Sequence, residues 1–119
     1  DRAKSPELTK EVITNINELV TKVNAFLAEL GITNVRVSSG FRTSAVNAGI
    51  AGAAKKSGHM IGKCVDIVDA DGKLGKLAMA KPQLLRKYGL FIENPAVTKG
   101  WLHIDYISRT DRPSRMFNP

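Results

Sequence analysis

The chain has 119 residues, 43% of them hydrophobic, and a formal net charge of +7. This length suits one domain built around a single core, so residues 1–119 are expected to fold as one unit. The lone cysteine excludes an intrachain disulfide, and no stretch is long and apolar enough to insert in a membrane.

The N-terminal quarter of the chain predicts one long helix. Apolar residues recur at helical spacing through residues 6–30. Ser5 followed by Pro6 is typical of a helix start, and Gly31 is typical of a helix end. The pattern indicates a helix that packs on the core and carries no chemistry.

The rest of the chain mixes short helices with strands. Valines alternate with polar residues before Gly40, which predicts a strand, and a short helix is expected to begin near Ser44. Residues 72–89 predict helix, with Pro82 either breaking it or starting a second one. Apolar and β-branched runs predict further strands over residues 63–70, 90–93 and 101–107, and residues 112–119 suit a short edge strand. This order favours an α+β domain with a small antiparallel sheet packed with helices.

A histidine and an aspartate lie close together in the segment SGHMIGKCVDI, residues 57–67. His59 stands in a loop between Gly58 and Gly62, and Asp66 lies on the strand that follows. Seven extended residues would span roughly 23 Å, so the chain must fold back if the two side chains are to bind the same ion. Gly62 is placed for that turn, and Gly58 adds conformational freedom beside the histidine.

Alternation along this strand puts Asp66 on the same face as Cys64, and Val65 and Ile67 on the other. A buried carboxylate needs a partner, and a cation is a good one. Cys64 fits a small buried side chain. A nucleophilic role beside His59 is the alternative for this cysteine.

The second histidine, His103, lies in the segment WLHIDY and shares a strand face with Trp101 and Asp105. Two histidines and one aspartate make a three-ligand set that leaves a fourth zinc position for water, as in catalytic zinc sites. The alternative is that both histidines are ordinary loop and sheet residues.

Three segments resemble the M15 family of zinc D-alanyl-D-alanine peptidases, in the order that the family has them. SGHMIGKCVDI resembles the family's Ser-x-His-(x)6-Asp signature, WLHID its third ligand segment, and SSGFRTSAVN its upstream Ser-Gly-aromatic-Arg segment. The likeness is to the compact subgroup found in phage endolysins and bacterial cell-wall peptidases. The family fold is α+β and is shared with the hedgehog signalling domain.

The resemblance implies a zinc ion held by His59, Asp66 and His103. It implies that Arg42 contacts a substrate carboxylate or the developing oxyanion, a role that suits a guanidinium. Ser57 would hold the loop at the substrate-binding site. Trp101 is a candidate to shape the cleft, and the alternative is an aromatic side chain in the core.

The catalytic base is the position where the sequence departs from the family. Some members carry an acid or a histidine two or three residues before the last ligand, where this chain has Trp101 and Gly100. Glu93 is the favoured base, because an antiparallel neighbour of the His103 strand could bring its carboxylate over the metal. Asp105 is the other acid, with a possible role as a partner of His103 or of an arginine.

The expected function is zinc-dependent hydrolysis of an amide bond in peptidoglycan stem peptides or cross-links, by a monomer acting at the cell wall or in the periplasm. Carboxypeptidase and endopeptidase action both stay open. One alternative is a catalytically inactive, zinc-containing module of the same fold that binds cell wall. A basic nucleic-acid-binding domain is a further alternative, but it accounts for none of the three motifs.

Overall fold

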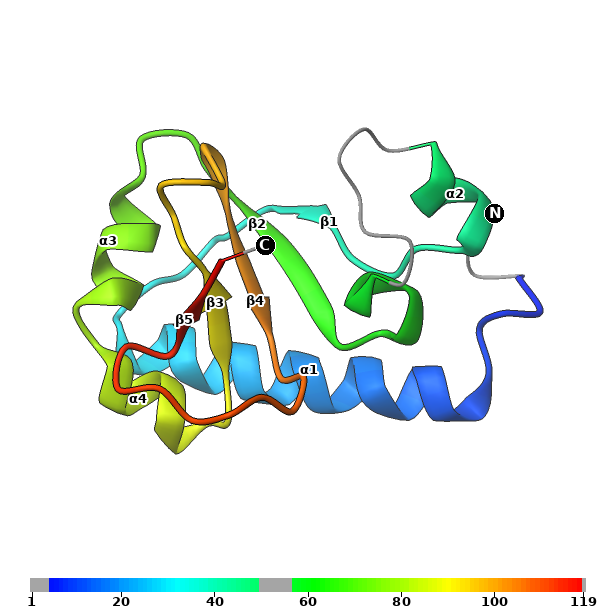
Figure 1. Cartoon of the computed structure of the whole chain (residues 1–119), viewed down its shortest axis with the longest axis horizontal. Helices are drawn as coiled ribbons and strands as arrows, with labels where there is room; N and C mark the ends of the chain where they lie inside the picture. Colours follow the sequence, from blue (N-terminus) through cyan, green and yellow to red (C-terminus); the bar gives the residue numbers. More distant parts are fainter. Residues whose placement is uncertain (1–4, 50–56, 119) are drawn as a thin grey trace.

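The computed structural model describes residues 5–49 and 57–118, which form helices packed on a five-stranded sheet (Figure 1). The elements in chain order are α1 (Lys10–Glu29), β1 (Val37–Ser39), α2 (Ser44–Ala48), the 3₁₀ helix η2 (Gly58–Ile61), β2 (Cys64–Asp69), α3 (Lys73–Met79), α4 (Pro82–Lys87), β3 (Phe91–Glu93), β4 (Gly100–Asp105) and β5 (Met116–Phe117). The expected α+β class is confirmed.

The sheet has the strand order β1-β2-β4-β3-β5. The pairs β1–β2, β2–β4 and β3–β4 are antiparallel, but β5 runs parallel to β3. The expectation of an antiparallel sheet is therefore wrong at this edge. Residues 106–115 carry the chain from the end of β4 past β3, so β5 is laid down in the same direction as β3.

The two faces of the sheet have different chemistry. One face packs against α1, which runs beneath the sheet in Figure 1. The strand residues in this core are Val65, Ile67, Ile92, Leu102 and Ile104. Their sequence neighbours Cys64, Asp66, His103 and Asp105 alternate onto the opposite face, as the sequence predicts. The site is thus built on the face away from α1.

The helix ends differ in part from expectation. The N-cap of α1 is Thr9, whose hydroxyl accepts a hydrogen bond from the Val12 amide at 3.2 Å, and not Ser5. Ser5 instead closes a turn, because its carbonyl accepts from the Leu8 amide. Pro82 begins α4 as a separate helix, one of the two alternatives that the sequence left open. The short helix begins at Ser44 as predicted, although residues 50–54 of that prediction lie outside the described residues.

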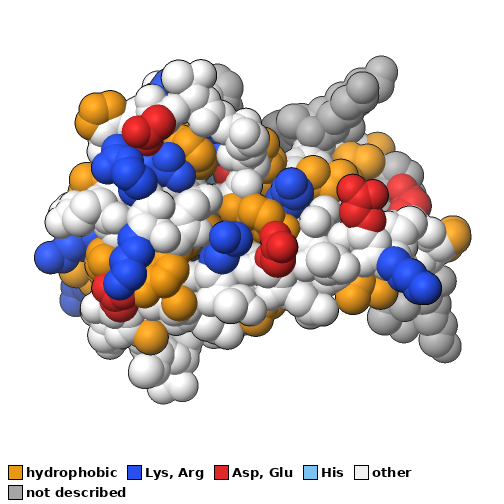
Figure 2. Space-filling model, turned by 90° about the horizontal axis from the view of Figure 1, so that it is seen from below, with side chains coloured by type: hydrophobic (Ala, Val, Ile, Leu, Met, Phe, Trp, Pro, Cys, Tyr) orange, Lys and Arg blue, Asp and Glu red, His pale blue; other side chains and the backbone are white. Residues whose placement is uncertain are grey.

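Among the described residues, no helix is both long enough and apolar enough to cross a lipid bilayer. Figure 2 views the molecule from the α1 side, where acidic and basic side chains are interspersed with apolar ones. On this face the positive charge is scattered rather than gathered in a single stripe of the kind that follows a nucleic acid backbone.

Candidate metal site

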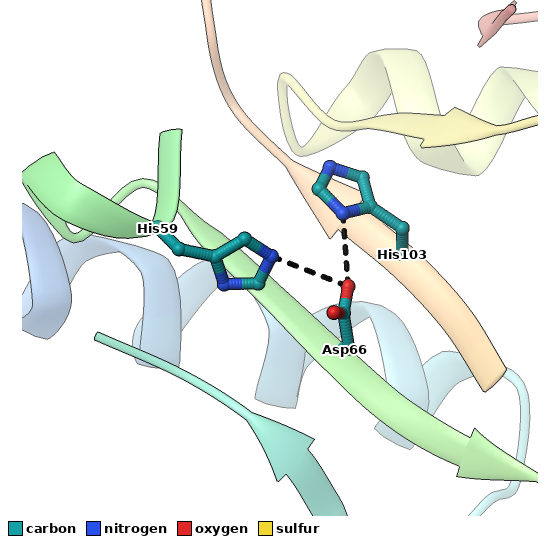
Figure 3. Close-up of side chains that lie close together, drawn as sticks. All are labelled: His59, Asp66 and His103. Atoms are coloured by element: carbon teal, nitrogen blue, oxygen red, sulfur yellow. Dashed lines mark hydrogen bonds and ion pairs between the residues drawn. The ribbon is translucent and has the colours of Figure 1, made fainter. Parts of the chain in front are cut away.

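Three side chains, from β2, β4 and η2, meet on the face of the sheet away from α1 (Figure 3). Asp66 on β2 lies directly opposite His103 on β4, and opposite residues of an antiparallel pair project from the same face. The Asp66 Oδ1 atom lies 2.9 Å from His103 Nδ1 and 3.4 Å from His59 Nε2. The ligand atoms of all three residues lie within 4.8 Å of one another.

The loop brings His59 back over β2 through a tight turn, as the sequence predicts. Gly62 ends η2 in the left-handed conformation, with φ of 77°. A Cβ at this position would also lie 2.9 Å from the Val12 carbonyl oxygen of α1. Gly62 is therefore required both for the turn and for the packing of the loop on α1.

Gly58 serves the loop in a different way from the one expected. It has no left-handed backbone, so conformational freedom is not its role. A Cβ here would lie 2.2 Å from Cys64 Sγ and 2.5 Å from Ile107 Cδ1. The glycine is needed because the loop approaches β2 too closely for any side chain.

Backbone groups fix the His59 ring. Its Nδ1 lies 2.8 Å from the Gly40 carbonyl oxygen, so Nδ1–H donates there and Nε2 is left facing Asp66. Ser57 caps η2, with its hydroxyl accepting from the His59 amide at 3.1 Å. This hydrogen bond is consistent with the predicted role of Ser57 in holding the loop, which stays a prediction.

Side chains fix the His103 ring. Its Nδ1 faces Asp66, and its Nε2 lies 2.8 Å from Asp105 Oδ2. Burial alone would lower the pKa of His103, but hydrogen bonds to Asp105 and Asp66 outweigh it and raise the pKa to about 11. Asp105 is fully buried and also forms a bidentate ion pair with Arg109. Asp105 thus forms a hydrogen bond with His103 and an ion pair with Arg109.

Asp66 joins the histidines to Arg42. Its Oδ1 faces both rings, and its Oδ2 accepts from Arg42 Nη2 at 3.2 Å. Burial raises the pKa of Asp66, yet the hydrogen bonds from His103 and His59 prevail and hold it well below its ordinary value. Arg42 is itself buried and donates to Ser39 Oγ and Asn47 Oδ1. The arginine therefore lies at the site, packed against the Asp66 carboxylate.

Glu93 lies on β3, the strand beside β4, and Trp101 lies on β4 itself, two residues before His103. Phe91 pairs with Asp105 and Ile92 with Ile104, and Glu93 is the next residue, at the end of β3. The expected neighbourhood of Glu93 and His103 is consistent with this pairing. Trp101 pairs with Val68 and is 37% exposed.

The three converging atoms suit a metal ion. Tetrahedral zinc, with bonds of about 2.0–2.1 Å, places its ligand atoms about 3.3 Å apart, close to the separations seen from Asp66 Oδ1. A second group, Cys64, His103 and Asp105, is also close enough to hold an ion. It is the weaker candidate, because Arg109 already pairs with both Asp105 oxygens. Burial raises the pKa of the Cys64 thiol, which favours its structural role over a nucleophilic one.

Sequence reasoning did not find the Gly40 carbonyl or Arg109. A carbonyl oxygen has no signature in the residue type, and Gly40 was notable only as the end of a strand. Arg109 lies four residues after Asp105 in a segment without helix, where that spacing predicts no contact.

An α+β domain that gathers two histidines and an aspartate on one face of its sheet is a candidate metalloprotein. The family model described as Peptidase M15 matches residues 3–105, and the chain therefore belongs to the M15 peptidase family. The comparisons with curated proteins and with solved structures gave no significant match.

Proposed function

We propose that this chain is a zinc metallopeptidase that hydrolyses an amide bond in peptidoglycan stem peptides or cross-links. The observation that carries the proposal is the convergence of His59, Asp66 and His103 in a member of a peptidase family. The net charge of +7 is consistent with a polymeric substrate rich in carboxylates, and such a substrate implies action at the cell wall.

In this proposal, His59 Nε2, Asp66 Oδ1 and His103 Nδ1 hold the zinc ion, each ring being oriented by the bond at its other nitrogen. Bound zinc supplies Lewis acidity towards an amide carbonyl and makes water a competent nucleophile near neutral pH.

Glu93 is the proposed general base and acid. It takes a proton from the attacking water and returns one to the leaving amine nitrogen, while the carbonyl carbon gains a C–O bond and loses its C–N bond. Asp105 suits this role less well, because it is fully buried and its oxygens are engaged by His103 and Arg109. Asp105 instead orients His103.

Arg42 and Trp101 are proposed to meet the substrate. The Arg42 guanidinium lies beside Asp66, where its charge stabilises an oxyanion or a stem-peptide carboxylate. Trp101 offers an exposed ring on the His103 strand for the cleft. Ser57 contributes through the loop that carries His59.

The test is Glu93→Gln, assayed for release of soluble products from purified cell-wall sacculi and for bound zinc. We expect a fall in kcat of at least about 100-fold with one zinc retained per chain. Glu11→Gln, on the exposed first turn of α1, is the matched control and should keep full activity. Normal turnover by Glu93→Gln would show that Glu93 is not the base. A wild-type protein that binds no zinc would exclude a zinc-dependent mechanism.

A second candidate function is a catalytically inactive module that binds cell wall through the same zinc-containing fold. It is favoured by Gly100 and Trp101, which stand where some family members carry an acid or a histidine. The module would sediment with sacculi and release no product. Release of product that stops with a chelator and returns with zinc would exclude it.

A further inference from the structure

The described chain continues beyond the family match, which ends at Asp105. Residues 106–118 cross to the edge of the sheet and end in β5, which lies beside β3 (Figure 1). Two of their side chains, Arg109 and Phe117, return to the His103 end of the metal site. We refer to these two residues as the C-terminal brace.

Arg109 reaches His103 through Asp105. Its Nη1 and Nη2 donate to the two oxygens of Asp105, the Nη2 bond being 2.9 Å long. The Ile107 amide adds a third donor, 3.2 Å from Oδ1. The carboxylate is thereby held in one plane, with Oδ2 left 2.8 Å from His103 Nε2.

Phe117 contacts the same histidine directly. Its ring lies edge-on to that of His103, with centroids 5.6 Å apart and an interplanar angle of 84°. The Arg109 guanidinium lies 3.7 Å from the centre of the Phe117 ring, so the two brace residues support each other. In the β3–β5 register Phe117 is also the partner of Glu93.

We propose that Arg109, supported by Phe117, is a positioning residue for the metal site. It locks Asp105 so that His103 keeps Nε2 on that carboxylate and presents Nδ1 to the metal. This inference rests on the proposed zinc site and extends it to a segment beyond the family match. The C-terminal segment is then part of the site and not only an edge of the sheet.

The first test compares zinc dissociation constants, measured by competition with a chromogenic chelator. Arg109→Gln should bind zinc about tenfold or more weakly than wild type, in the range typical of outer-shell changes. Arg109→Lys keeps the charge but loses the bidentate guanidinium, so its zinc dissociation constant should lie between those of wild type and Arg109→Gln. Arg86→Gln is the matched control, because Arg86 also anchors this segment, through Asp111 and the Arg112 carbonyl, without contacting Asp105.

A double-mutant cycle separates positioning from general stability. If Arg109 acts through Asp105, then Arg109→Gln should weaken zinc binding no further in an Asp105→Asn background. Full additivity would overturn the inference, as would wild-type zinc affinity in Arg109→Gln or an equal loss in Arg86→Gln. Wild type that binds no zinc would overturn the proposed function as well, so the two failures are distinguishable.

Discussion

The two histidines of the site are held by different kinds of structure. His59 lies on the short helix η2, and its ring is anchored to the Gly40 carbonyl while its loop packs on α1 through the Asn15–Ile61 hydrogen bond. His103 lies on the central strand β4, and its ring is anchored between the carboxylates of Asp66 and Asp105.

The two histidine rings are therefore held in place by different kinds of interaction. Backbone carbonyls and the close packing of glycine hold His59, so crowding of the loop should disturb it most. A chain of ionised side chains holds His103, so loss of one member leaves buried charge without its partner. Substitutions can therefore be chosen to disturb either the His59 loop or the His103 strand and leave the other in place.

The largest contrast is expected between the two histidine deletions in the metal-free protein. Both His103→Ala and His59→Ala should lose stoichiometric zinc. His103→Ala takes one partner from each of two buried carboxylates, Asp66 and Asp105, and should cost about 3 kcal/mol of unfolding free energy. His59→Ala leaves the Gly40 carbonyl unpaired and takes only the longer of the two histidine contacts from Asp66, so it should cost about 1.5 kcal/mol. Urea unfolding in a chelator measures both, and an equal or larger loss in His59→Ala would contradict the contrast.

Crowding of the loop is expected to have the next largest effect. Gly58→Ala places a methyl group against Cys64 Sγ and Ile107 Cδ1 and should destabilise the fold by about 2 kcal/mol. Removing the sulfur with Cys64→Ala should return part of that loss.

Gly40→Ala is the matched control for this crowding. Its Cβ would meet only Val37 Cγ1, at 4.0 Å, so the change should stay within about 0.5 kcal/mol. A Gly58→Ala protein as stable as wild type would show that the loop yields easily.

The sequence predicts the strand side of the site better than the loop side. Alternation along β2 and β4 was enough to put Asp66 and His103 on one face and Val65 and Leu102 in the core. The turn at Gly62 also followed from the distance that the chain had to fold back. The catalytic role of Glu93 stays a prediction, because the pairing of β3 with β4 gives its place in the sheet and not its chemistry.

What the sequence could not predict depends on contacts between distant backbone segments. Gly58 looked like a hinge, but its reason is a close approach that only the packed loop reveals. The residues after β4 suited an edge strand, yet nothing in them fixed the direction of β5. Ser5 and Thr9 are both good N-caps by residue type, and only the structure shows that Thr9 is the one used.

A smaller contrast is expected in the pH dependence of metal binding. Burial opposes the proton on His103, but the two carboxylates prevail and raise its pKa to about 11, so the metal-free ring is protonated near neutrality. Zinc must displace that proton, and the dissociation constant should fall about tenfold for each unit of rising pH.

Calorimetry in buffers of different ionisation enthalpy should therefore detect proton release from His103 on zinc binding. Since the folded pKa lies above the ordinary 6.5, the protonated ring stabilises the metal-free fold fully below that pH and progressively less as the pH rises towards 11. A zinc affinity that is independent of pH would contradict this account of the strand side.

The smallest effect is expected from the cap of the loop. Ser57→Ala removes the hydroxyl that accepts from the His59 amide and should cost about 1 kcal/mol. Thr9→Ala removes a cap of the same kind from α1, far from the site in the chain, at a similar cost. Only Ser57→Ala should also weaken zinc binding, because it loosens the loop that carries His59. The loss should be only a few-fold, because the Gly40 carbonyl still orients the His59 ring. Equal zinc affinities in the two variants would mean that the backbone contacts alone position His59.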